Sequence, residues 1–336
     1  MTGSFTKEKE IKMNGKEQYD WKRHYDCTIK PEKSIGDFKY YTLENDTGSG
    51  KIVTYEIFPG LLAVYNDLSF ERCGKVVEPG DDIIQINYCS EGRYVRKVSD
   101  RYMFYVSHGD LSIGTVGRRE TGGLFPTKRF CGLSLFMDYC EFQNSAGKLL
   151  DELKISLNEI IRLSKSKPRY YTLREIQKID RVYDLLISAI IERRMPMIRL
   201  KVFELLMILC DPEIMTEPNI PEYLSKKQVD IAKEAEKMMT EDLSTQLTIS
   251  EMAGRIGVSP TSLKTAFKGV YGVSIKDYRK QFKYQEAMRL VKETSEPITE
   301  IAAMVGYSNP GKFIAGFKSS FGVTPGALRK KDDRFS

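Results

Sequence analysis

Apolar positions follow two different periods along the chain. Between residues 51 and 137, short runs rich in Val, Ile, Tyr and Phe occupy 52–58, 61–64, 83–88, 93–98, 102–106 and 133–137. Turn-forming pairs lie between them, at Pro59-Gly60, Pro79-Gly80, Glu91-Gly92 and His108-Gly109. Short β-branched and aromatic runs with turn signals at this spacing predict an antiparallel sandwich or barrel.

After residue 137 the pattern becomes helical. One apolar stripe steps through Ala146, Leu150, Leu153, Leu157 and Ile160, and a second through Ile176, Ile179, Tyr183, Leu186 and Ile190. Two such helices would pack antiparallel, and this spacing suits either a dimer seam or helices that cover the sheet of their own chain. A third helix is predicted over 198–209, and the proline-containing stretch 211–226 reads as an interdomain linker.

The last hundred residues carry one pattern twice. Ala253 and Gly257 match Ala302 and Gly306 at an offset of 49, because 302 minus 253 and 306 minus 257 both give 49. At an offset of 50, the matching residues are Pro260, Leu263, Phe267, Gly272 and Val273 with Pro310, Phe313, Phe317, Gly322 and Val323. The two copies therefore differ by one residue inserted in the turn.

This spacing has a mechanical cause. Two helices that cross over a short turn need a small residue where they approach and a residue that tolerates left-handed backbone between them. Helix starts are marked independently: Thr248 with Glu251 forms a capping box, and Ser259, Asn309 and Thr324 each precede a proline. An all-helical bundle that merely contains Ala and Gly is the alternative, and two copies with matching caps argue against it.

The region 247–329 resembles the double helix-turn-helix DNA-binding domain of the AraC/XylS family of bacterial transcription regulators. The resemblance includes Gly-Tyr-Ser-Asn-Pro at 306–310 and Phe-Gly-Val-Thr-Pro at 321–325. It implies an α+β chain with a cupin-like β-barrel sensing domain, a helical dimerisation segment and an all-α DNA-binding domain. The expected boundaries are 1–35 for a polar leader, 36–140 for the sensing domain, 141–210 for the dimerisation segment, 211–226 for the linker and 227–332 for the DNA-binding domain.

The two second helices are expected to read DNA. In the first, Thr261, Lys264 and Thr265 match family positions that reach base edges, while Lys268 and the helix N-terminus would meet phosphates. The second departs from the family pattern, since Ala315 matches a position that is frequently Arg and Gly311 has no side chain. It is expected to contribute phosphate anchoring, methyl contacts and shape readout. The predicted DNA-binding residues are Ser259, Thr261, Ser262, Lys264, Thr265, Lys268, Asn309, Gly311, Lys312, Ile314, Ala315 and Lys318.

The positive charge is concentrated in the same region. Residues 227–336 hold 18 Lys and Arg against 13 Asp and Glu, so about +5 of the chain's net charge of +6 lies there. The excess is local, and the basic residues are Lys264, Lys268, Lys276, Arg279, Lys280, Lys283 and Arg289. Such a stripe is the electrostatic footprint expected for binding phosphates, although a solvated helix face looks the same.

The N-terminal part offers an effector pocket but little catalytic chemistry. An aromatic and arginine-containing interior would suit a ring-bearing or anionic small molecule, with Tyr88, Arg93, Tyr94, Tyr102 and Phe104 as candidates. The alternative is that the aromatic residues belong to the core and Arg93 to a turn. The two histidines, His24 and His108, and the six cysteines show no metal-ligand spacing, so neither a metal nor another cofactor is expected, and the thiols are predicted to be buried and reduced.

A non-enzymatic regulator is therefore the predicted function. We expect a cytoplasmic homodimer, without a signal region or a membrane span, that binds promoter DNA and RNA polymerase under the control of a small-molecule effector. A metal-dependent cupin enzyme fused to a DNA-binding module is the main alternative. A DNA-repair methyl acceptor is a second, and it would need a cysteine-rich zinc cluster that the sequence lacks.

Overall fold

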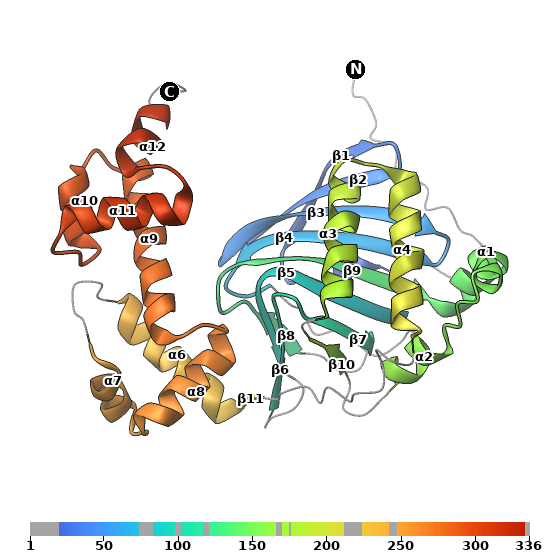
Figure 1. Ribbon diagram of the computed structural model, residues 1–336, viewed down its shortest axis with the longest axis horizontal. Helices are drawn as coiled ribbons and strands as arrows, with labels where there is room; N and C mark the ends of the chain where they lie inside the picture. Colours follow the sequence, from blue (N-terminus) through green and yellow to red (C-terminus); the bar gives the residue numbers. More distant parts are fainter. Residues whose placement is uncertain are drawn as a thin grey trace, which may run out of the picture.

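The computed structural model contains an N-terminal body built on a β-sheet and a C-terminal body built of helices (Figure 1). The structure describes residues 20–73, 83–97, 102–116, 121–165, 170–174, 176–211, 224–241 and 247–332. The predicted combination of an N-terminal sheet with helices and an all-helical C-terminal domain is confirmed. Residues 212–223, most of the predicted linker, lie outside the described residues, whereas 224–226 belong to a short strand and to the start of a helix.

The sheet is antiparallel at every described pairing. Its strands are β1 (Thr28–Ile35), β2 (Phe38–Asn45), β3 (Gly48–Phe58), β4 (Leu61–Phe70), β5 (Ile83–Lys97), β6 (Tyr102–Ser107), β7 (Leu111–Thr115), β8 (Thr121–Leu124), β9 (Phe130–Asp138), β10 (Tyr170–Leu173) and β11 (Leu224–Ser225). The order is β1-β2-β3-β4-β9-β5-β6-β11, with β7 and β8 also paired to β5. Within the described residues β1 pairs only with β2, so closure into a cupin-like barrel stays a prediction.

Strand β5 joins two parts of the sheet. Its first half pairs with β9 and β7, and its second half pairs with β6 and β8. The change coincides with a register shift between Cys89 and Glu91, and Gly92 has φ of 84°. The turn predicted at Glu91-Gly92 is therefore wrong, because the pair forms an irregularity inside one long strand, where a bulge bends the sheet.

The described helices that follow the main sheet are α1 (Tyr139–Glu152), α2 (Asn158–Ser164), α3 (Gln177–Ile191) and α4 (Met195–Leu209). Helices α3 and α4 lie side by side across one face of the sheet (Figure 1). Leu150, Leu157, Tyr183 and Leu186 are at most 3% exposed, in one core with sheet residues such as Leu135. These residues therefore cover the sheet of their own chain, which is one of the two alternatives that the spacing left open. The single helix expected for the first stripe is wrong, because α1 ends at Glu152 and α2 begins only at Asn158, and Leu153 between them is 39% exposed. Dimerisation through this segment stays a prediction.

The opposite face of the sheet carries a second core, which includes Phe104 and Phe136. A 3₁₀ turn, η1 (Trp21–His24), closes over it: Trp21 is 6% exposed and its ring lies 5.1 Å from that of Tyr41. The boundary expected at residue 35 does not coincide with the start of the sheet, because β1 already pairs with β2 from Thr28 and Trp21 packs against the second core.

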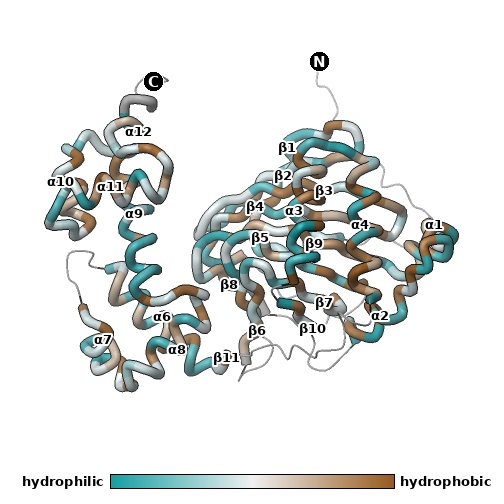
Figure 2. Tube along the Cα trace, in the orientation of Figure 1, coloured by the Kyte–Doolittle hydropathy of each residue, from teal (hydrophilic) through white to brown (hydrophobic). Residues whose placement is uncertain are grey.

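The C-terminal body consists of α6 (Lys226–Thr240), α7 (Ile249–Ile256), α8 (Pro260–Tyr271), α9 (Ile275–Glu293), α10 (Ile298–Met304), α11 (Pro310–Phe321) and α12 (Pro325–Asp332). Helix α4 is largely hydrophobic in colour, whereas α9 is largely hydrophilic (Figure 2). Two separate cores flank α9, one shared by α6, α7 and α8, the other by α10 and α11.

Candidate nucleic-acid interface

The first helix-turn-helix unit is formed by α7 and α8. Thr248 and Glu251 form the predicted capping box at the start of α7, and Gly257 ends it with φ of 76°. Ser259 then accepts a hydrogen bond from the backbone N–H of Ser262, which starts α8 with a proline at its first turn. Ala253 is 1% exposed, as expected for the small residue at the crossing of the two helices.

The outer face of α8 is exposed to solvent. Leu263, Ala266 and Phe267 are buried, so the helix packs through one side and presents the other outward. All five predicted contact residues on this helix are exposed: Thr261, Ser262, Lys264, Thr265 and Lys268. The orientation inferred from the apolar spacing is confirmed, while the assignment of each residue to bases or phosphates stays a prediction.

The second unit repeats this geometry with α10 and α11. Gly306 has φ of 74°, and Asn309 Oδ1 accepts a 3.0 Å hydrogen bond from the N–H of Lys312. Phe313 and Phe317 are fully buried. Gly311, Lys312, Ala315 and Lys318 are exposed, whereas Ile314 is half-buried and packs against the core of this unit, which leaves less of its side chain for the predicted methyl contacts.

Helix α9 joins the two units, and Ser274 caps its first turn by accepting a hydrogen bond from the backbone N–H of Asp277. Its 19 residues correspond to roughly 28 Å at ~1.5 Å per residue, which is comparable with the ~34 Å between successive major grooves on one face of DNA. The exposed faces of α8 and α11 are thus connected by one continuous helix, α9.

The basic stripe predicted on α9 is only partly available to DNA. Lys276 and Lys280 are exposed. Lys283 is only 6% exposed, and Arg279 donates a 2.8 Å hydrogen bond to the backbone carbonyl of Leu247. Arg289 is paired with Glu286 and Glu293. The expectation of a continuous phosphate-binding stripe is therefore wrong at Arg279, Lys283 and Arg289, because the first two turn toward the protein and the third pairs with carboxylates of its own helix.

The N-terminal body contacts the first unit directly. Strand β11 pairs with β6 and leads into α6, and Val95, Tyr105 and Leu224 belong to the core of the first unit. Arg93, only 4% exposed, donates a hydrogen bond to the carbonyl of Gly269 in the last turn of α8 and lies 4.0 Å from the Tyr105 ring. Its burial lowers the pKa of Arg93 to about 10, so the guanidinium remains charged at neutral pH at a helix end that favours cations.

The predicted effector residues do not converge on one pocket. Tyr88 stacks on Tyr183 at 4.2 Å in the core under α3 and donates a hydrogen bond to Asp180. Tyr94 and Phe104 lie in the core on the opposite face of the sheet. Arg93 turns toward α8, and the side chain of Tyr102 is outside the described residues. The prediction of one shared interior is wrong for Tyr88, Arg93, Tyr94 and Phe104. Arg93 and Tyr94 point to opposite faces because side chains alternate along a strand. Tyr88 and Tyr94 lie on opposite faces because the register shift between Cys89 and Glu91 changes the alternation within β5.

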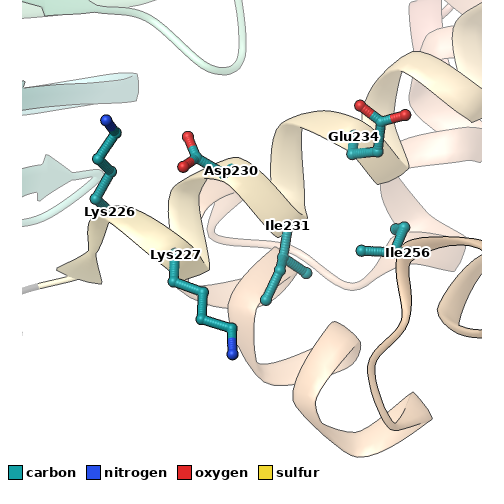
Figure 3. A pocket seen from close by; sticks show the side chains of 6 residues that line it. All are labelled: Lys226, Lys227, Asp230, Ile231, Glu234 and Ile256. Carbon is teal, nitrogen blue, oxygen red and sulfur yellow. The ribbon is translucent and has the colours of Figure 1, made fainter.

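A hollow of about 540 Å³ lies beside α6 (Figure 3). Its apolar lining comes from Ile231 of α6 and Ile256 at the end of α7, and its charged residues are Lys226, Lys227, Asp230 and Glu234. Its two cations and two carboxylates balance in charge, so the hollow has no electrostatic preference for an anionic DNA backbone.

Other predicted features have mixed outcomes. All six cysteines are free thiols, but Cys140 is exposed, so the expectation of burial is wrong for that residue. In the described part of the chain, no three His, Cys, Asp or Glu side chains come together in a way that could hold a metal ion. None of the described helices is both long and apolar enough to cross a membrane.

Two helix-turn-helix units, each with an exposed second helix, are joined by α9. This arrangement defines a double helix-turn-helix DNA-binding domain. The family described as Helix-turn-helix domain matches residues 252–331. The HTH-type transcriptional regulator GlxA of Rhizobium meliloti is 35% identical over 96 residues, 29% of this chain and 29% of GlxA. The HTH-type transcriptional activator RhaR of Pectobacterium carotovorum is 34% identical over 73 residues, 22% of this chain and 26% of RhaR.

Among solved structures, the C-terminal domain of AraT, a response regulator from Geobacillus stearothermophilus, is 30% identical. That alignment covers 30% of this chain and 84% of the AraT domain, with a TM-score of 0.29. This chain matches less than a third of the length of GlxA and RhaR. The predicted resemblance of the C-terminal domain to AraC/XylS family transcription regulators is confirmed over the matched residues 252–331.

Proposed function

We propose that this regulator binds promoter DNA sequence-specifically, each copy reading two successive major grooves through α8 and α11. The observation that carries the proposal is the pair of exposed recognition faces at the two ends of α9. Thr261, Lys264 and Thr265 would read base edges, and Lys268, Lys312 and Lys318 would bind phosphates. In the second unit Gly311 and Ala315 offer little to base edges, so its readout depends mainly on DNA shape.

A small-molecule effector bound by the N-terminal body would control this binding. The face of the sheet that carries Tyr94 and Phe104 supports this role, because it combines aromatic side chains with the buried polar residues Asn66 and Ser134. An apolar site with few polar groups is typical of small-ligand pockets. Arg93 belongs to the contact with α8 instead, which offers a route by which the N-terminal body influences DNA binding.

Homodimerisation is supported by the outer surface of α3 and α4. Leu185, Ile191, Leu200 and Met207 are at least 50% exposed there, on the side of the helices that does not face the sheet. A second copy would cover these side chains, since exposed apolar patches of this kind mark interaction sites. A cytoplasmic dimer bound to two half-sites would act as an activator by recruiting RNA polymerase.

Selection of binding sites from random duplex DNA with the full-length chain tests the proposal. We expect a recurring site, contacts in two major grooves per copy, and a steep fall in affinity with salt because lysines displace counterions from phosphates. Binding without any sequence preference would refute sequence-specific regulation.

A further inference from the structure

Helix α9 contributes side chains to the cores of both units. Residues before Lys283 pack into the first core, and residues after it pack into the second. Ile275, Tyr278 and Phe282 pack into the core of the first unit, and Tyr284 packs into the core of the second. Lys283 lies between Phe282 and Tyr284 and is only 6% exposed. A buried ammonium is costly unless it is hydrogen-bonded, so its partners indicate what it does.

Those partners belong to the turn of the second unit. The Nζ of Lys283 donates a 3.3 Å hydrogen bond to the carbonyl of Gly306 and lies 5.7 Å from the centre of the Tyr307 ring. Gly306 is the left-handed residue that sets the angle between α10 and α11. The Tyr307 ring also stacks on Tyr284 of α9 at 5.6 Å. Lys283 therefore connects α9 to Gly306, the residue whose backbone sets the direction of α11.

One turn earlier, Arg279 makes the equivalent contact with the first unit. Its Nη2 donates a 2.8 Å hydrogen bond to the carbonyl of Leu247 and lies 3.7 Å from the Met252 sulfur. Leu247 directly precedes Thr248, the cap of α7. Residues four apart are neighbours on one helix face, about 6 Å apart along the axis, so both units are tied to one short segment of α9.

We propose that Lys283 and Arg279 are positioning residues that fix the orientation of the two units relative to each other, and so set the spacing between the two DNA segments that one copy accepts. This inference rests on the proposed two-groove function. The two cations are held together against their mutual repulsion: burial, and next the charge of Arg279, lowers the pKa of Lys283. Cations that bind carbonyls of different units make directional links, which apolar packing alone does not supply.

The test compares full-length wild type with Lys283→Met, which keeps the apolar stem without the ammonium, and with Arg279→Met. Lys292→Met is the matched control, because Lys292 is an exposed lysine on the same helix. Affinity is measured on the selected site and on versions with one base pair added or removed between the two contacted grooves. Each such change rotates one groove by about 34° relative to the other.

Wild type and Lys292→Met are expected to lose about tenfold in affinity for each change, comparable with one mismatched base pair. Lys283→Met and Arg279→Met are expected to bind the original site more weakly but to lose less than about threefold on the altered sites. Hydrogen exchange without DNA gives a second readout: peptides spanning 303–308 should exchange faster in Lys283→Met than in Lys292→Met. A spacing profile and an exchange rate equal to wild type in Lys283→Met would overturn the inference.

The same experiment separates this inference from the proposed function. If wild type contacts only one groove or shows no preferred spacing, the two-groove function is wrong. If wild type has a sharp spacing optimum and both methionine variants retain it, only the positioning role of Lys283 and Arg279 is wrong. If Lys283→Met does not fold, Arg279→Met decides the spacing test by itself.

Discussion

Replacing Arg93 with methionine is expected to loosen the N-terminal body from the first helix-turn-helix unit. Arg93 is 4% exposed, donates a hydrogen bond to the Gly269 carbonyl and stacks on Tyr105. It also fills the space beside Gly272, where a Cβ would lie 2.6 Å from Arg93 Nη1. Methionine retains the apolar stem but removes both the charge and the donors.

Two interactions that methionine cannot make set the magnitude of the effect. A hydrogen bond from a charged donor contributes about 1.5–3 kcal/mol, and a cation over an aromatic ring about 0.5–2 kcal/mol. Removing a buried charge also relieves its desolvation cost, which offsets part of this loss. We therefore expect a net change of about 1–3 kcal/mol, or about 5- to 150-fold in the ratio of docked to undocked molecules.

Hydrogen exchange at Leu224 and Ser225 measures this ratio, because β11 pairs with β6 of the N-terminal body. Exchange there should accelerate by the same factor in Arg93→Met, while β3 and β4 retain their protection. Arg162→Met is the control, since Arg162 is exposed and pairs only locally with Glu159. Equal protection of β11 in the two variants, or loss of protection throughout the sheet, would refute the docking role of Arg93.

Three further outcomes are expected. Lys264→Ala should cost ~1–3 kcal/mol of DNA-binding free energy and relax the sequence preference at one base pair. Lys268→Ala should weaken binding to all sequences alike and lower the slope of log affinity against log salt concentration by about one. Equal, sequence-independent losses in both variants would contradict base reading by Lys264. Leu157→Lys, at a residue 3% exposed, should unfold the N-terminal body, whereas Leu200→Lys, at a residue 59% exposed, should give a folded monomer in sedimentation; an unchanged dimer would place the interface elsewhere. Asn309→Ala should lower the free energy of unfolding of the second unit by ~1 kcal/mol in denaturant titration, and an unchanged midpoint would show that the cap is dispensable.

The C-terminal domain could be predicted closely because its signals are local. Thr248, Ser259 and Asn309 cap helices through neighbours three residues away, and Gly257 and Gly306 are needed for left-handed backbone whatever surrounds them. The exposed face of α8 follows directly from helical spacing. Such features depend on a few consecutive residues, so the sequence contains all that determines them.

The direction of Lys283 and Arg279 could not be predicted in this way. Both residues look like members of a surface stripe, and only the packing of the two units around α9 turns them inward. The same limit applies to the two apolar stripes, whose spacing suits either a core or a seam and did not show that the first is divided between α1 and α2. In the sheet, β1 could not be predicted because its side chains are almost all polar or exposed, so it has no alternating apolar pattern. It is a strand because its backbone pairs with β2.

Footprinting of the full-length chain on a selected half-site tests the central claim most directly. If α8 and α11 enter successive major grooves, each copy should protect two segments about 10–10.5 bp apart on one face of the duplex. Inserting ~5 bp between them turns the second segment to the far side, where α9 cannot carry the second unit, and affinity should fall to that of one unit alone. Protection of a single groove, or equal affinity after the insertion, would contradict the account.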